Sequence, residues 1–135
     1  YLVCDELIKQ FLVNTSRSLI FTTALPPINL AWTRFVFEKM LVMNSARKHL
    51  NDISLYLSKA LNAPSKSHIV PYILGENEHA VAFSKHLLDN GFLVLPIRHP
   101  TVPLGTARLR SSLQASLSGE DVKKLVDMMK DSNLR

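Results

Sequence analysis

The sequence predicts an α/β fold in which a small sheet of about three strands has helices packed on one side and is preceded by a helical segment. Three observations predict this fold. Apolar residues recur at helical spacing over most of the first half of the chain. After the loop at residues 62–67 the periodicity changes, and short apolar runs typical of strands alternate with helical patterns. The chain has 135 residues, of which 47% are hydrophobic, and this is enough for one compact core.

The opening of the chain mixes strand-like and helical patterns. Residues 1–4 are typical of the middle of a buried strand, and this abrupt start indicates that the chain is cut from something longer. Residues 5–14 predict a short amphipathic helix with Asp5 as its N-cap. Residues 18–23 predict a short β-type run, which the Pro26-Pro27 pair then stops.

Two longer helices are expected next. Pro27 suits the first position of a helix, and residues 27–43 are apolar nearly all round, so this helix needs cover on most of its sides. Residues 45–61 carry apolar positions on one face and charged positions on the other, which predicts an amphipathic helix. The change of pattern near residue 43 predicts a boundary between a leading segment, residues 1–42, and a compact α/β module, residues 43–135.

Strands and helices alternate in the C-terminal module. The strand expected at residues 68–74 contains Pro71, which has no N–H to donate and therefore favours an edge position or a bulge. Residues 76–90 predict a helix, and residues 92–97 and 107–113 predict two buried strands. The inner face of the helix is expected to consist of Ala80, Val81, Phe83, Leu87 and Leu88.

Two helix ends carry clear local signals. Asn90-Gly91 is a typical helix stop, because glycine adopts the left-handed conformation that closes a helix. Ser118 and Asp121 have the spacing of a capping box, which predicts the start of a last amphipathic helix.

Composition excludes several classes of function. The net charge is +5, but the basic residues are scattered and no run exceeds two, which argues against nucleic-acid binding. A single cysteine, Cys4, excludes an internal disulfide and fits a reducing cytoplasm. No apolar run is long enough to span a membrane. The five histidines form no metal-ligand cluster, so no metal site is expected.

The richest functional signal is a stretch of arginines without acidic neighbours. From Gly91 to Gly119 there is no Asp or Glu, yet Arg98, Arg108 and Arg110 all fall there. A guanidinium grips a carboxylate or phosphate through a rigid two-donor fork. Arg108 and Arg110 share one strand face by period two. The stretch therefore predicts an anion-binding site. The alternative is that these are ordinary solvated surface arginines, and it is weaker for three arginines in a window without acidic residues than for one arginine alone.

A second signal is the pair of hydroxyls at Thr22 and Thr23, directly before the expected helix start at Pro27. Hydroxyls and free backbone N–H groups near a helix N-terminus favour phosphate, because the donors and the helix dipole point the same way. The alternative is that these threonines only end a strand, and the pattern by itself leaves this open.

Taken together, these motifs resemble the α-oxoamine synthases, which are pyridoxal-phosphate enzymes of the fold type I aminotransferase class. The resemblance covers essentially the whole chain, in order. The Thr-Ala-Arg-Leu-Arg sequence at residues 106–110 favours the oxononanoate synthase branch of biotin synthesis. It implies that residues 1–42 end a large cofactor-binding domain and that residues 43–135 form the C-terminal small domain. The matching motifs are Phe21-Thr22-Thr23-Ala24-Leu25-Pro26-Pro27, Ile97-Arg98-His99-Pro100-Thr101-Val102-Pro103 and Gly105-Thr106-Ala107-Arg108-Leu109-Arg110.

The resemblance also implies a role for each site residue. Arg110 would hold the carboxylate of the amino-acid substrate, and Thr101 and Arg98 would lie near the substrate and the entry of the acyl thioester. Thr22 and Thr23 would reach the cofactor phosphate of the neighbouring subunit, so that the sites form across a homodimer. The implied reaction joins an acyl-CoA, pimeloyl-CoA in this branch, to L-alanine with loss of carbon dioxide, and pyridoxal phosphate supplies the electron sink.

The departures from the family pattern limit what this chain can do alone. The family's Schiff-base lysine lies upstream of the strand-like start, and no lysine here has the matching context, so the chain carries no catalytic residue and is expected to be inactive by itself. After Arg110, residues 114–117 depart from the family's usual Thr-Ala-Ala-His. The rival hypothesis is a stand-alone α/β module that binds a small carboxylate through Arg98 and Arg110.

Overall fold

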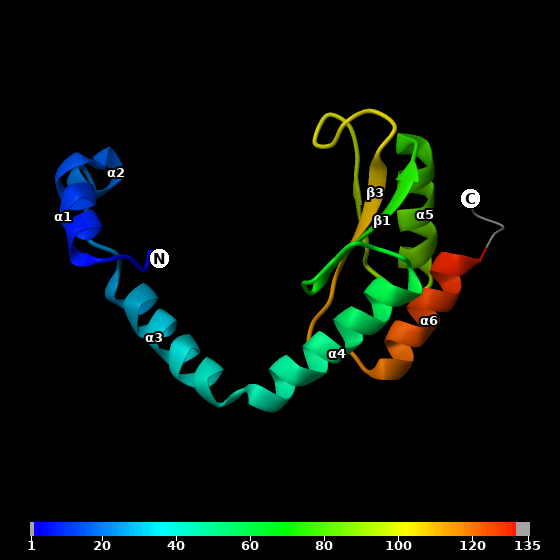
Figure 1. The fold of residues 1–135 in the computed structure, drawn as a ribbon, viewed down its shortest axis with the longest axis horizontal. Coiled ribbons are helices and arrows are strands. Elements are labelled where there is room, and N and C mark those ends of the chain that lie inside the picture. The colour runs from blue at the N-terminus through cyan, green and yellow to red at the C-terminus, as the bar shows by residue number, and fades with distance from the viewer. Residues whose placement is uncertain (1, 132–135) are drawn as a thin grey trace. The chain divides into compact units, whose positions relative to one another are not determined.

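A computed structural model describes residues 2–131 (Figure 1). Its backbone contacts divide the chain into two compact units, Tyr1–Val42 and Met43–Arg135, and each is described separately below. The elements in chain order are α1 (Glu6–Thr15), α2 (Arg17–Ile20), α3 (Pro27–Val42), α4 (Asn44–Ala60), β1 (Ile69–Gly75), α5 (Asn77–Asp89), β2 (Leu95–Ile97), β3 (Ala107–Ser112) and α6 (Gly119–Lys130).

The first unit is helical and buries none of its helical residues. The N-cap of α1 is confirmed, because the Asp5 side chain accepts a hydrogen bond from the Ile8 N–H at 3.1 Å. The helix expected from Pro27 is α3, and it begins at that proline. Its apolar side chains are exposed all round, including those of Trp32 and Leu41. A helix of this kind is stable only when another surface covers it.

Two strand predictions for this unit are wrong. The run at residues 18–23 falls partly in the short helix α2 and partly in an irregular segment, and Leu2–Cys4 is exposed and irregular. Tyr1 lies outside the described residues. The physical reason is the same in both places. A strand needs a partner for its backbone N–H and C=O groups, and the described residues of this unit contain no other strand.

The second unit is built on an antiparallel sheet of three strands in the order β1-β3-β2. The last strand in the sequence is therefore the central one. The edge position that Pro71 favours is confirmed, since β1 stands at one end of the strand order among the described residues. The strand expected over residues 92–97 is only partly formed, because β2 begins at Leu95 and the Leu93 side chain is 75% exposed.

Three helices lie on the same side of the sheet, as Figure 1 shows for α4, α5 and α6. Helix α5 contacts all three strands, α4 contacts β1, and α6 packs on α4. The core lies between the sheet and these helices. Each fully buried large side chain in the core contributes about 2 kcal/mol of burial free energy. Val81 and Leu88, expected on the inner face of α5, are exposed instead because they lie outside the stripe that meets the sheet. The largest fully buried side chains are Phe83, Leu57, Leu87, Leu109, Met129, Val70 and Val122.

The helix ends follow the local signals. Gly91 adopts a positive φ of 87° just after α5, as a glycine stop requires. At the start of α6 the Ser118 hydroxyl accepts from the Asp121 N–H, and the Asp121 carboxylate accepts from the Ser118 N–H, so the capping box is confirmed. Hydrogen bonds from the Ser118 side chain and backbone, in that order, lower the pKa of the Asp121 carboxyl below its ordinary value.

Candidate anion-binding site

The central strand β3 presents two different faces. Ala107, Leu109 and Ser111 are buried on the side of the helices, whereas the intervening residues lie on the opposite, open face. Arg108 is half-buried there and Arg110 is exposed. This alternation follows from the period of two along a strand. The expectation that the two arginines share one face, with Leu109 turned away, is confirmed.

Apolar residues flank both arginines on the neighbouring strands. Arg110 is paired across the sheet with Pro71 of β1 and with Leu95 of β2. Arg108 is paired in the same way with Ile73 and Ile97. Two guanidiniums therefore stand in a row along the central strand, and their cross-strand neighbours on this face are apolar. An anion bound there would be shielded from water on two sides, which strengthens its attraction to the cations.

A depression of about 500 Å³ lies on this open face. Thr101, Arg108 and Arg110 line it together, so the structure brings together two of the three residues expected to bind substrate. The rest of its lining is Pro64, Ser65, Ser67, Ile69, Pro71 and Ile97. The hydroxyls of Ser65 and Ser67 both donate to the Ile69 carbonyl oxygen at the start of β1, which leaves the arginines and Thr101 as the donors that face a ligand.

Arg98, the third expected residue, does not line the depression. It is exposed at the start of the loop that carries Thr101, and its carbonyl oxygen accepts a hydrogen bond from the Thr101 N–H at 2.9 Å. The loop is also fixed at the next residue, because the His99 N–H donates to the Asn77 side-chain oxygen at 3.2 Å. Arg98 thus supports the position of Thr101 through its backbone.

The charges of this face are not balanced by acidic groups. Neither Arg108 nor Arg110 has a carboxylate partner among the residues that the structure describes. The Nε of Arg108 donates to the Thr106 carbonyl oxygen at 3.0 Å, which turns this side chain toward the loop at residues 101–106. Arg108 belongs to the arginine stretch from which the sequence predicts an anion-binding site, but the family resemblance gave it no role of its own. The signal for it was available in the same period-two spacing that singles out Arg110.

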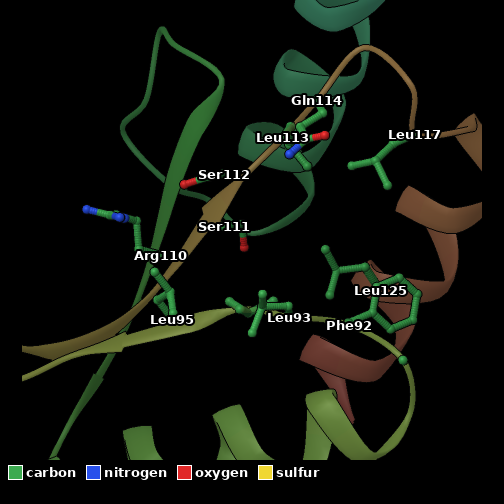
Figure 2. Close-up of a pocket in the computed structure, with 12 residues that line it drawn as sticks. Phe92, Leu93, Leu95, Arg110, Ser111, Ser112, Leu113, Gln114, Leu117 and Leu125 are labelled. Atoms are coloured by element: carbon green, nitrogen blue, oxygen red, sulfur yellow. The ribbon is translucent and has the colours of Figure 1, made fainter.

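A second depression, of about 360 Å³, lies where the end of β3 meets the segment before β2, and it was not expected from the sequence (Figure 2). Its walls are mainly apolar and come from Phe92, Leu93, Leu113, Leu117 and Leu125. In Figure 2 the Arg110 side chain points away from these walls, so it serves the open face instead.

One polar atom is buried beside this second depression. Ser111 is 2% exposed, and its hydroxyl has no hydrogen-bond partner among the described residues. A buried hydroxyl without a partner costs stability. No carboxylate, histidine, cysteine or lysine lines the depression, and its one charged side chain is that of Arg110, which points outward.

Thr22 and Thr23 lie in the first unit, in the exposed segment before α3. The Thr22 hydroxyl donates to the Thr23 carbonyl oxygen at 2.9 Å. Their donor chemistry suits a phosphate, since both hydroxyls are exposed and can turn toward an anion. Their place in an active site shared with Arg110 stays a prediction.

Residues 2–131 contain no group of three or more potential metal ligands. None of the helices in this part of the chain combines the length and the hydropathy that a membrane span requires.

The chain matches a family model and several known proteins. The family model described as aminotransferase class I and II matches residues 1–129. The 8-amino-7-oxononanoate synthase of Haemophilus ducreyi is 49% identical over 132 residues, which are 93% of this chain and 34% of that protein. The chain therefore spans about a third of the length of the curated relatives it matches.

Two solved structures share the fold of this chain. The serine palmitoyltransferase of Sphingomonas wittichii matches with a TM-score of 0.82 and 29% identity over 95% of this chain and 34% of that one. The 8-amino-7-oxononanoate synthase of Francisella tularensis matches with a TM-score of 0.76 and 25% identity, over 93% of this chain and 38% of that one.

Proposed function

The chain belongs to the aminotransferase class I and II family, and we propose that it is the C-terminal part of an α-oxoamine synthase, with the 8-amino-7-oxononanoate synthases as the branch it serves. Enzymes of this family depend on pyridoxal phosphate. In this proposal residues 1–42 end the large domain and residues 43–135 form the small domain. The parent enzyme condenses an acyl-CoA, pimeloyl-CoA in this branch, with L-alanine and releases carbon dioxide.

The observation that carries the proposal is Arg110. Its guanidinium stands on the open face of the sheet, between Pro71 and Leu95, with no acidic partner among the described residues. A planar two-donor fork in apolar surroundings is the arrangement that best holds a carboxylate. Arg110 thus binds and orients the carboxylate of the amino acid. Thr101, in the same depression, adds a neutral hydroxyl donor beside it.

The cofactor would be held mainly by parts of the parent enzyme outside these residues. This chain offers the hydroxyls of Thr22 and Thr23, which fit a phosphate group by their chemistry and their exposure. They would donate to the cofactor phosphate of the neighbouring subunit in a homodimer. The cofactor, when bound, supplies an electron sink for the bond that breaks at the amino acid. No described lysine has the sequence context of the family's covalent one, so the chain alone is proposed to be inactive.

A chimera tests the proposal directly. The C-terminal third of the Haemophilus ducreyi relative is replaced by this chain, and release of CoA from pimeloyl-CoA is measured against L-alanine concentration. The chimera is expected to be active. Arg110→Gln is expected to lower kcat/KM for L-alanine by about a hundredfold, because a charged hydrogen-bonded pair is worth about 2–3 kcal/mol.

The control removes a charge far from the site. Lys85→Gln, on the exposed side of α5, should leave kcat/KM within about twofold. An Arg110→Gln chimera that keeps its full kcat/KM would refute the role of Arg110. The chain alone, treated with pyridoxal phosphate and borohydride, should form no stoichiometric adduct, and a specific one would contradict the assignment of the covalent lysine to another part of the enzyme.

A further inference from the structure

Arg108 has more donors than its surroundings use. Its Nε donates to the Thr106 carbonyl oxygen, while the two terminal nitrogens of the guanidinium have no hydrogen-bond partner among the described residues. The side chain is half-buried between Ile73 and Ile97, its neighbours across the sheet. A cation that is partly removed from water and left unpaired is costly, so its presence calls for an anion that binds beside it.

The carboxylate at Arg110 is not that anion. Arg108 and Arg110 are two residues apart on one strand, which places their backbones about 7 Å from each other. The hydrogen bond to Thr106 draws the Arg108 guanidinium further toward the loop at residues 101–106. A carboxylate centred on the fork of Arg110 therefore leaves the terminal nitrogens of Arg108 to bind another group, although both side chains line the same depression of about 500 Å³.

We propose that Arg108 binds a second anionic group, so that this sheet face receives ligands with two carboxylate-like groups, one at Arg110 and one at Arg108. The inference rests on the proposed function, in which Arg110 holds the carboxylate of the amino acid. The second group then belongs to the acyl substrate. The apolar residues of β1 and β2 that flank the row of arginines provide contacts for the carbon chain of the acyl substrate.

The test measures binding of small carboxylates to the 135-residue chain by titration calorimetry at low salt. The probes are α,ω-dicarboxylates of four to nine carbons and the monocarboxylates of the same lengths. The best dicarboxylate is expected to bind at least tenfold more tightly than its monocarboxylate, with a clear optimum of chain length. The optimum reflects the fixed spacing of the two guanidiniums.

Variants assign the two ends of the ligand. Arg108→Gln should abolish the advantage of the dicarboxylate and leave monocarboxylate binding within twofold, whereas Arg110→Gln should weaken both. Arg108→Lys retains a cation and should keep part of the advantage, and Lys85→Gln serves as the charge control. The comparison of the two probe series on the unmodified chain needs no variant, so it remains decisive if a substituted chain fails to fold.

The outcomes separate this inference from the proposed function. Monocarboxylate binding that depends on Arg110, with no gain from a second carboxylate, would overturn the role of Arg108 and leave that of Arg110 standing. Equal loss of both probe series on Arg108→Gln would also overturn it, because Arg108 would then only support Arg110. A chain that binds no carboxylate through Arg110 would refute both proposals.

Discussion

Replacement of Ser111 by alanine is expected to stabilise the second unit, although the residue lies in the central strand. Its hydroxyl is buried and has no hydrogen-bond partner among the described residues. An unsatisfied buried hydroxyl costs about 1–3 kcal/mol. The void left by one oxygen atom is on the order of 10 Å³, which at about 24 cal/mol per Å³ costs about 0.2 kcal/mol. The net gain in the free energy of unfolding is therefore about 1 kcal/mol or more.

Chemical denaturation followed by circular dichroism measures this gain as a higher midpoint at unchanged slope. Two matched serines serve as controls. Ser58 is also buried, but its hydroxyl donates to the Ala63 carbonyl oxygen, so Ser58→Ala should lower the free energy of unfolding by about 1 kcal/mol. Ser112→Ala, on the open face of β3, should change the free energy of unfolding by less than about 0.5 kcal/mol. Destabilisation by Ser111→Ala as large as that by Ser58→Ala would refute the reasoning, because it would show that the hydroxyl has a partner.

Two further predictions concern the ends of helices. Because its pKa is lowered in the fold, the Asp121 carboxylate contributes stability above its unfolded-state pKa and loses that contribution as the pH falls through its folded-state pKa. Asp121→Asn should therefore lower the denaturation midpoint at neutral pH, and the difference from the unmodified chain should vanish in acid; a difference that persists unchanged in acid would contradict this. Gly91→Ala should destabilise by about 1 kcal/mol, since φ is 87° there, whereas Gly119→Ala, at the open start of α6, should stabilise by a few tenths. Equal shifts in the melting temperature of the two alanine variants would contradict the idea that backbone conformation causes the difference in stability.

The sequence predicts the second unit much better than the first. Helix α5 and the capping box of α6 depend on interactions between residues three or four apart, which the sequence displays directly. Residues 18–23 have strand-forming side chains, but a strand also needs a partner that propensity does not supply. In the same way, Leu93 is apolar yet exposed, because β2 pairs with β3 only from Leu95 onward.

The site shows the same limit. Period two along β3 predicts that Arg108 and Arg110 point the same way. It does not predict that Pro71 and Leu95 flank Arg110, because that depends on the register between strands far apart in the sequence. Thr22 and Thr23 share this difficulty to a greater degree, since their proposed partners lie in another subunit.

The two-faced character of β3 ties the integrity of the core to the integrity of the site. A slip of this strand by one residue would drive Arg108 and Arg110 into the layer of helices and turn Leu109 out to water. The alternation therefore favours the native register, because a shifted sheet would lose free energy in two ways. It would bury the two arginine charges, and it would expose Leu109 to water. Single-residue insertions or deletions between Ala107 and Ser112 should therefore be tolerated far less than those in the loop at residues 62–67, whichever property of the molecule is assayed.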